Sequence, residues 1–223
     1  MRLLCFANSK KDGGRCLAGL AWPDLEKWIR PVTGEGAVRT EQTFILDAGK
    51  DREIELFDLI DVPLTSPVPK PYHPEDWGMS EEPIRFIRKV PQEEVLERLF
   101  EISRNQFDLF GFSGDSIDSR DADRGLEASL TMVAANDVSF QKRGYQWRVL
   151  FNLGKEDFDL SLTDLQYRKK LQGVNSATIN GECILICSLG EPFLLTKGQY
   201  RGTRRLYKLV VGVIPIRAGG YIT

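Results

Sequence analysis

The sequence has little of what metal and redox sites are built from. Its 223 residues include one histidine, His73, and four cysteines, namely Cys5, Cys16, Cys183 and Cys187. One histidine cannot build a His-rich metal centre. No two cysteines form a C-x-x-C pair, which excludes a zinc ribbon and a thioredoxin motif. We expect all four cysteines to be small buried hydrophobic residues. His73 stands between prolines in PKPYHPEDW, and we expect it to pack or hydrogen-bond in an extended segment.

Long apolar runs and the common catalytic motifs are also missing. The apolar stretch over residues 3–7 is too short for a signal peptide, and no window reaches the roughly 18 apolar residues of a membrane helix. We therefore expect a cytoplasmic protein with no membrane partner. The spacings G-x-G-x-x-G, G-x-x-x-x-G-K-[ST] and G-x-S-x-G do not occur. The sequence predicts no cofactor, no metal ligand and no catalytic residue.

Neither sign of charge prevails over the whole chain, because 30 basic residues face 32 acidic ones. A net charge of -2 excludes a polybasic protein that coats nucleic acid through bulk charge. Within the chain, however, charge is sorted. Residues 91–127 hold ten acids and four arginines, whereas residues 1–30 hold six bases and three acids. From Pro192 to the end there are six bases and no acid. A local basic surface is therefore compatible with the balanced total.

Strand-like patterns fill the first part of the chain. Residues 2–7 resemble a strand, residues 15–21 and 26–32 a hairpin, and residues 54–65 a further strand. Residues 33–53 are polar and contain glycine, so we expect an irregular loop there. The run SPVPKPYHP contains four prolines, which predicts an extended segment outside any central strand.

One helix is well marked in the middle of the chain. The segment PQEEVLERLFEISRN, residues 91–105, places Val95, Leu96, Leu99 and Ile102 on one apolar stripe. Residues 105–127, rich in Asp, Ser and Gly, are expected to form a loop or linker. Strand patterns return over residues 128–135, 138–141, 145–153, 157–163, 183–190 and 205–216. A short helix is expected over 163–172, with Thr163 as its N-cap.

The strands thus form two groups with no alternation of strand and helix. This argues for two small β-barrels or sandwiches and against a parallel α/β sheet. We expect a first β unit over residues 1–90, a helix and acidic linker over 91–127, and a second β unit over 128–223.

Basic and aromatic residues are interleaved at two places that suit nucleic acid. In KGQYRGTRRLYK, tyrosines can stack bases and cations can pair with phosphates. An ordinary hairpin loop with inward-packed tyrosines is the structural alternative. In WIRPV, Trp28 and Arg30 share a strand face. This pair can stack a base or bind phosphate, and it can equally pin the Pro-rich segment by a structural hydrogen bond.

Several stretches together resemble the bacterial dual-OB domain family, whose members carry two OB-type barrels in one chain. They are RLLCFANSKKDGGRCLAGL, WIRPV and LIDVPLTSPVPKPYHPEDW in the first half, and FDLSLTDLQY, SLGEPF and YKLVVGVI in the second. The resemblance implies a mainly β fold of two small OB-like β-barrels joined by a helix and an acidic linker. It also implies a nucleic-acid-binding module of bacterial conflict or defence systems.

We therefore expect a non-catalytic protein that binds RNA or single-stranded DNA. The candidate nucleic-acid-binding residues are Lys10, Lys11, Arg15, Trp28, Arg30, Arg148, Tyr200, Arg201, Arg204, Arg205 and Lys208. Two alternatives stay open. One is a protein-interaction or regulatory module whose acidic linker faces a basic partner. The other is a metal-dependent nuclease that uses the acids Asp115, Asp118, Asp121 and Asp123.

Overall fold

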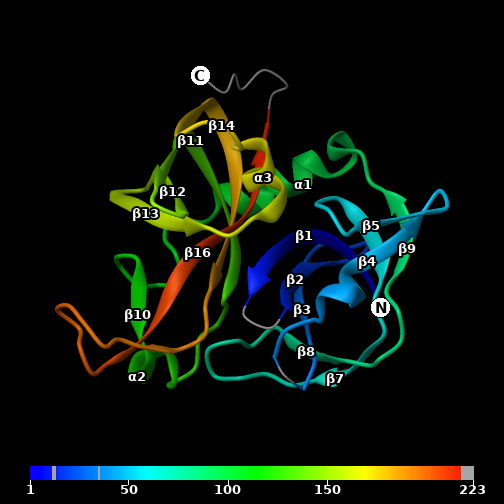
Figure 1. Ribbon diagram of the computed structural model, residues 1–223, viewed down its shortest axis with the longest axis horizontal. Coiled ribbons are helices and arrows are strands. Elements are labelled where there is room, and N and C mark those ends of the chain that lie inside the picture. Colours follow the sequence, from blue (N-terminus) through cyan, green and yellow to red (C-terminus); the bar gives the residue numbers. More distant parts are fainter. Residues whose placement is uncertain (12–13, 35, 217–223) are drawn as a thin grey trace.

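The computed structural model of the chain describes residues 1–11, 14–34 and 36–216. Strands take 52% of the residues and helices 13%, so the mainly β fold class is confirmed. Two curled sheets lie side by side in Figure 1, one drawn in blue to cyan at the right and the other in green to red at the left.

The first sheet is a half-barrel. Its order is β7-β8-β3-β2-β1-β6-β9, with β3 and β8 parallel and the other neighbours antiparallel. Its strands are β1 (Arg2–Lys11), β2 (Gly14–Ala21), β3 (Trp28–Val32), β6 (Asp58–Asp61), β7 (Leu64–Pro67), β8 (Asp76–Met79) and β9 (Arg85–Lys89). The predicted hairpin is confirmed as β2–β3. The Pro-rich segment begins in β7, which lies at the edge of the sheet. Prolines have no N–H to donate to a neighbouring strand, so an edge position suits them.

Residues 33–53 are not the irregular loop that we expected. They contain the 3-10 helix η1 (Thr40–Thr43) and a two-stranded sheet of β4 (Phe44–Asp47) and β5 (Lys50–Glu53). Ile45 is buried in the half-barrel interior, while Arg52 of β5 is ion-paired with Asp47 at 2.8 Å. Ile45 is the buried apolar residue that anchors this polar hairpin. Because a single buried position gives no repeated alternation of apolar and polar residues, the sequence did not predict these strands.

The second sheet contains a closed barrel. Its strands are β10 (Ser116–Asp118), β11 (Leu130–Arg143), β12 (Gln146–Leu153), β13 (Glu156–Leu162), β14 (Ser176–Leu189), β15 (Phe193–Leu194) and β16 (Arg204–Pro215). The ring runs β11-β12-β13-β16-β14 and back to β11, with β13 and β16 parallel. The helix α3 (Leu165–Lys170) joins β13 to β14. A five-stranded Greek-key barrel of this kind is an OB fold, as the resemblance implied.

Both predicted helices are present, with one change at a cap. The helix α1 (Gln92–Arg104) buries Val95 and Leu99 of the predicted stripe. For α3, Thr163 as N-cap is wrong. The cap is Asp164, whose Oδ1 accepts hydrogen bonds from the backbone N–H groups of Gln166 and Tyr167. A carboxylate at a helix N-terminus satisfies two of the unpaired donors there.

The expectation of a loop or linker over residues 105–127 is wrong in part. The strand β10 pairs with β16, and it leads into the short helix α2 (Ser119–Ala122). Ile117 and Ala122 are buried in a small core with Leu189 and Leu206. Much of this acidic segment therefore packs on the closed barrel. The domain boundaries at residues 90 and 128 stay a prediction.

The half-barrel and the closed barrel share one hydrophobic core. Leu4 and Phe6 of β1 pack in a cluster with Ile184 and Ile186 of β14, and α1 adds Leu99. β16 passes so close to β1 that a Cβ on Gly212 would lie 2.5 Å from the Phe6 carbonyl oxygen. Contacts this close leave no room for solvent, so the two sheets pack as directly as the layers of one domain.

The cysteines follow the prediction at three positions. Cys183 and Cys187 both point into the closed barrel, and burial raises the pKa of each thiol to about 12. Cys5 is buried in the half-barrel. The prediction is wrong for Cys16, which is partly exposed.

Candidate nucleic-acid interface

An OB barrel commonly binds oligonucleotides on the face of its second and third strands, which here are β12 and β13. The basic residue predicted on this face, Arg148, is already paired. Arg148 Nε donates to Asp159 Oδ1 at 2.7 Å, and its Nη1 donates to Ser161 Oγ at 2.7 Å. Burial raises the pKa of Asp159, but Arg148 and Arg143 lower it by more, which keeps the carboxyl ionised. Arg148 is therefore balanced by an acid on its own face.

The corresponding face of the half-barrel is covered. Ala18 and Leu20 of β2 are buried in the shared core, together with residues of the closed barrel. Trp28, at the start of β3, packs against the same core and meets Phe6 edge-on, with ring centroids 6.2 Å apart. The usual OB ligand face of the first unit is thus occupied by protein.

The segment 193–205, which we term the basic hairpin, gathers the largest share of the predicted residues. It connects β14 to β16 and extends away from the body as an orange loop at the lower left of Figure 1. Tyr200, Arg201 and Arg204 are exposed. Arg205 lies over the Tyr200 ring, with its Cζ atom 4.2 Å from the centroid. The sequence alone did not decide whether Tyr200 packs inward. In the structure Tyr200 is exposed, where a base can reach it.

Arg30 lies in the interior and not on this surface. It is 2% exposed, and its Nη1 donates to Asp76 Oδ1 at 3.3 Å. Its Nη2 donates to Ser129 Oγ at 2.9 Å and to Ser188 Oγ at 3.4 Å. Because both serines belong to the second half of the chain, Arg30 joins the two sheets. The structural hydrogen bond that the sequence offered as an alternative is present.

Lys208 and Arg15 also have internal partners. Lys208 is 1% exposed, its Nζ donates to the Phe112 carbonyl oxygen, and burial lowers the pKa of its ammonium group. Arg15 Nη2 lies 2.7 Å from Glu53 Oε1, an acid that also meets Lys169 of α3 at 3.4 Å. Neither cation faces solvent freely enough to be counted with the basic hairpin.

Lys10 is exposed near the end of β1, and it lines a pocket with Arg30 and Phe193. Phe193 in turn pairs with Arg205 across β15 and β16. The fold thus brings Lys10, which is near the start of the chain, close to the basic hairpin, which is near the end of the chain. The side chain of Lys11 lies outside the described residues.

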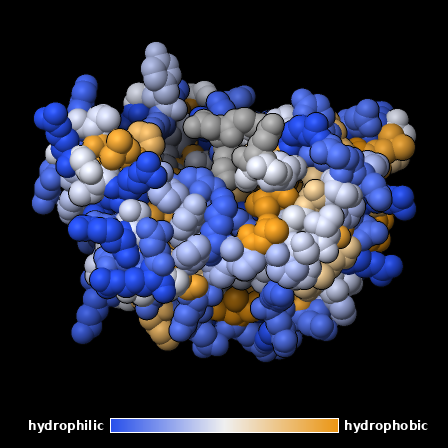
Figure 2. All heavy atoms as spheres, turned by 90° about the horizontal axis from the view of Figure 1, so that it is seen from below, coloured by the Kyte–Doolittle hydropathy of each residue, from blue (hydrophilic) through white to orange (hydrophobic). Residues whose placement is uncertain are grey.

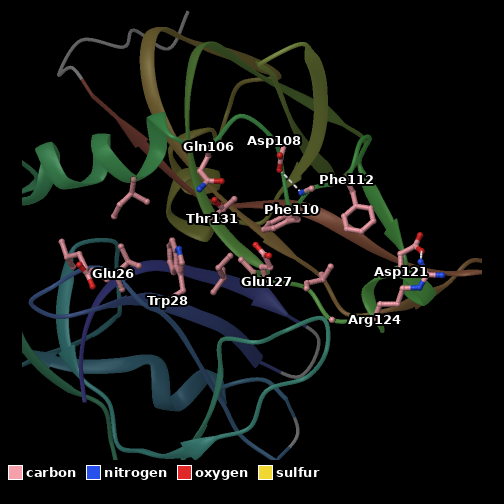
Figure 3. A pocket seen from close by; sticks show the side chains of 18 of the residues that line it. Glu26, Trp28, Gln106, Asp108, Phe110, Phe112, Asp121, Arg124, Glu127 and Thr131 are labelled. Carbon is pink, nitrogen blue, oxygen red and sulfur yellow. Dashed lines mark hydrogen bonds and ion pairs between the residues drawn. The ribbon is translucent and has the colours of Figure 1, made fainter.

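A larger groove of about 900 Å³ runs between the two sheets. Trp28, Phe110 and Phe112 line it, and Figure 3 shows Glu127 pointing toward Phe110. Four acids and two arginines are among its lining residues: Glu26, Asp108, Asp121, Glu127, Arg98 and Arg124. This excess of carboxylates repels phosphate, so the groove is a poor path for a nucleic-acid backbone.

The comparison with family models agrees with the topology. The dual OB-containing domain model matches residues 1–213. The chain belongs to this family. The comparisons with curated proteins and with solved structures gave no match. The resemblance noted in the sequence is therefore confirmed at the level of the family and its fold.

In this dual OB-containing domain, two of the four acids of the nuclease alternative are ion-paired with nearby arginines. Asp118 caps α2 and meets Arg120 at 2.9 Å, and the hydrogen bonds from Arg120 hold the pKa of this carboxyl well below its usual range. Asp121 meets Arg124 at 3.3 Å. In the described ranges no three His, Cys, Asp or Glu side chains are grouped so as to hold a metal. Over the same ranges, no helix has the length and apolar character to cross a membrane.

Sequence reasoning missed two apolar side chains of the dual OB-containing domain. Phe193 is 61% exposed and Leu194 is 48% exposed, both on β15 at the base of the basic hairpin. These two residues follow SLGEP in the sequence. At that place an apolar pair could equally be the buried end of a strand, so the sequence did not indicate that the pair is exposed. Figure 2 shows the face seen from below as mostly hydrophilic with small separate apolar patches. Exposed aromatic residues on such a surface can serve recognition.

Proposed function

We propose that the chain binds single-stranded nucleic acid, RNA or DNA, through the basic hairpin, without catalysing a reaction on it. The proposal includes a bacterial defence system, which is the setting that the resemblance implies, and a cytoplasmic location, which we expect from the sequence. The observation that carries it is the exposed Tyr200 ring beneath the Arg205 guanidinium, in a segment without an acid.

The chemistry of the hairpin fits a single strand in two ways. Lys197, Arg201 and Arg204 are exposed cations that can pair with successive phosphates. Tyr200 and Phe193 present ring faces on which unstacked bases can lie, each stack contributing roughly 1–3 kcal/mol. A duplex keeps its bases stacked inside, so exposed rings favour single strands.

The packing of the two sheets supports the same location. The half-barrel face is buried, and Arg148 on the β12–β13 face is neutralised by Asp159, which favours the loop between the last two barrel strands. Such loops flank the ligand in OB folds. The hairpin also lies in the stretch from Pro192 to the end of the sequence, which holds six bases and no acid.

The test is fluorescence anisotropy with a labelled U20 oligonucleotide at several salt concentrations. With the three exposed hairpin cations, and with Arg205 held by Ser116 of β10, the slope of log K against log[salt] should be about −2 for a single strand. The double variant Arg201→Ala/Arg204→Ala should reduce that slope by about 1.4. Tyr200→Ala should weaken binding about tenfold with the slope unchanged.

A matched control removes two cations elsewhere. Lys50 of β5 and Arg85 of β9 are exposed, and these two strands lie on the side opposite the hairpin in Figure 1. Lys50→Ala/Arg85→Ala should leave both affinity and slope unchanged. Equal losses from the two double variants would show diffuse charge attraction and would refute the hairpin as the site.

The second candidate function is a module that binds a basic polypeptide segment in the inter-sheet groove. The observation that favours it is the combination of acids with Trp28 and Phe110 there, since a cation can lie over an aromatic ring beside a carboxylate.

Calorimetry with a hexalysine peptide tests binding in this groove. Glu26→Gln/Glu127→Gln should weaken binding, whereas Glu93→Gln/Glu97→Gln, on exposed positions of α1, should not. Equal effects of the two pairs would argue against the groove.

A further inference from the structure

A second, smaller pocket lies where the two sheets meet, next to the basic hairpin. Its volume is about 280 Å³, near the lower end of the range for ligand sites. The half-barrel contributes Ser9, Lys10 and Arg30, and the closed barrel contributes Ser188, Phe193 and Leu209. A molecule bound here would touch both sheets at once.

The polar groups of the pocket are held by the fold. Arg30 is fixed by Asp76, Ser129 and Ser188. These contacts use Nη1 and Nη2, and the buried Nε of Arg30 has no hydrogen-bond partner within the described part of the chain. A buried donor without an acceptor is costly. An acceptor on a ligand, or a water, at the pocket floor would lower that cost.

The pocket combines this polar floor with an apolar wall. Leu209 and Val211 of β16 line it on one side, and the Phe193 ring lies at its border with the hairpin. Lys10 is exposed at the pocket and can bind an anion there, while the lining carboxylate of Glu191 lies 3.6 Å from the Lys70 ammonium group. A flat, partly apolar group with an attached anion therefore fits the lining better than a free anion or an alkyl chain.

We propose that this pocket takes one nucleotide of the bound strand, with the base against Leu209 and Phe193 and the phosphate on Lys10. The inference rests on the proposed function and adds to it a defined position for one base. It predicts that a free mononucleotide such as UMP binds in the same place, more weakly than an oligonucleotide does.

Cys16 provides a direct reporter. It lines the pocket, and it is the partly exposed cysteine of the chain, whereas Cys5, Cys183 and Cys187 are buried. The experiment measures the rate at which iodoacetamide alkylates Cys16, by peptide mass spectrometry, with increasing UMP or U10. Both ligands should slow alkylation at least fivefold at saturation.

Variants separate this pocket from general charge effects. Lys10→Glu should raise the UMP concentration for half-protection at least tenfold, whereas Lys50→Glu, at an exposed position of β5, should leave it unchanged. Calorimetric titration of UMP into the Lys10→Glu and Lys50→Glu proteins gives a second measurement that does not depend on thiol reactivity.

The outcomes distinguish the pocket from the hairpin. If U20 binds by anisotropy while neither UMP nor U10 protects Cys16 and UMP gives no heat, the pocket is refuted and the hairpin stands. If U20 does not bind while UMP protects Cys16 in a Lys10-dependent way, the pocket is supported as a mononucleotide site and the proposed function is refuted.

Discussion

Replacing Arg30 with methionine tests whether this arginine holds the two sheets together. The substitution keeps an unbranched side chain about as long as the arginine stem out to Nε, and it removes the guanidinium. Asp76, which is 1% exposed, then loses the Arg30 guanidinium, and Ser129 and Ser188 lose a donor each. Breaking a buried ion pair from one side costs about 3–5 kcal/mol. That is a large part of the roughly 5–15 kcal/mol that stabilises a folded protein.

The measurement is equilibrium unfolding in urea, followed by tryptophan fluorescence and by far-UV circular dichroism. Arg204→Met is the matched control, because Arg204 is exposed and surface substitutions usually stay within about 0.5 kcal/mol. The double variant Arg30→Met/Asp76→Leu should recover much of the loss, since a buried ion pair replaced as a whole by apolar side chains is often neutral.

The opposite pattern would refute this reasoning. If Arg30→Met lowers the free energy of unfolding by less than about 1 kcal/mol and yet abolishes U20 binding, Arg30 acts on the ligand. The ligand-binding role that the sequence allowed would then be the correct one.

Two further predictions concern contacts between the sheets. Gly212→Ala should lower the free energy of unfolding by about 1–3 kcal/mol through overpacking against the Phe6 carbonyl, whereas Gly34→Ala, with no atom within 4 Å of the added Cβ, should change it little. Burial raises the pKa of Glu53, but Arg15 and Lys169 lower it by more, so its folded-state pKa lies below the unfolded value. Its contribution of about 0.5–1 kcal/mol should be present above pH 4.5 and lost as the pH falls through the folded-state pKa. Glu53→Gln should therefore flatten the acid limb of a urea-unfolding pH series, and an unchanged limb would contradict the assignment.

Local patterns predicted the elements that have a strong period or a clear turn. The α1 stripe of Val95 and Leu99 follows from helical spacing, and the β2–β3 hairpin follows from two neighbouring strand-like stretches. The β4–β5 hairpin and β10 could not be predicted in this way. Each is stabilised by partners far along the chain, as when Ile117 of β10 pairs with Leu206.

For the candidate site, too, features that depend on local sequence could be predicted and features that depend on distant partners could not. Exposed cations of a turn-rich segment, such as Arg201 and Arg204, could be predicted from composition alone. The burial of Arg30 could not, because its partner Asp76 lies 46 residues away and Ser188 lies 158 residues away. A charged residue in a strand gives no local sign of whether a distant carboxylate or a ligand will meet it.

The shared core links binding to the stability of the whole chain. Because the face of the half-barrel that usually binds ligands in OB folds packs on the closed barrel, the ligand surface that we propose lies on the hairpin and at the junction where Lys10 and Arg30 meet Phe193. A strand that occupies both places contacts both sheets and binds only when they are docked. Ligand at about 100 times its Kd should then add about 2.7 kcal/mol to the free energy of unfolding, within a single transition. Two separate transitions, with only the closed barrel stabilised, would show that the sheets unfold independently and that the hairpin binds without the junction.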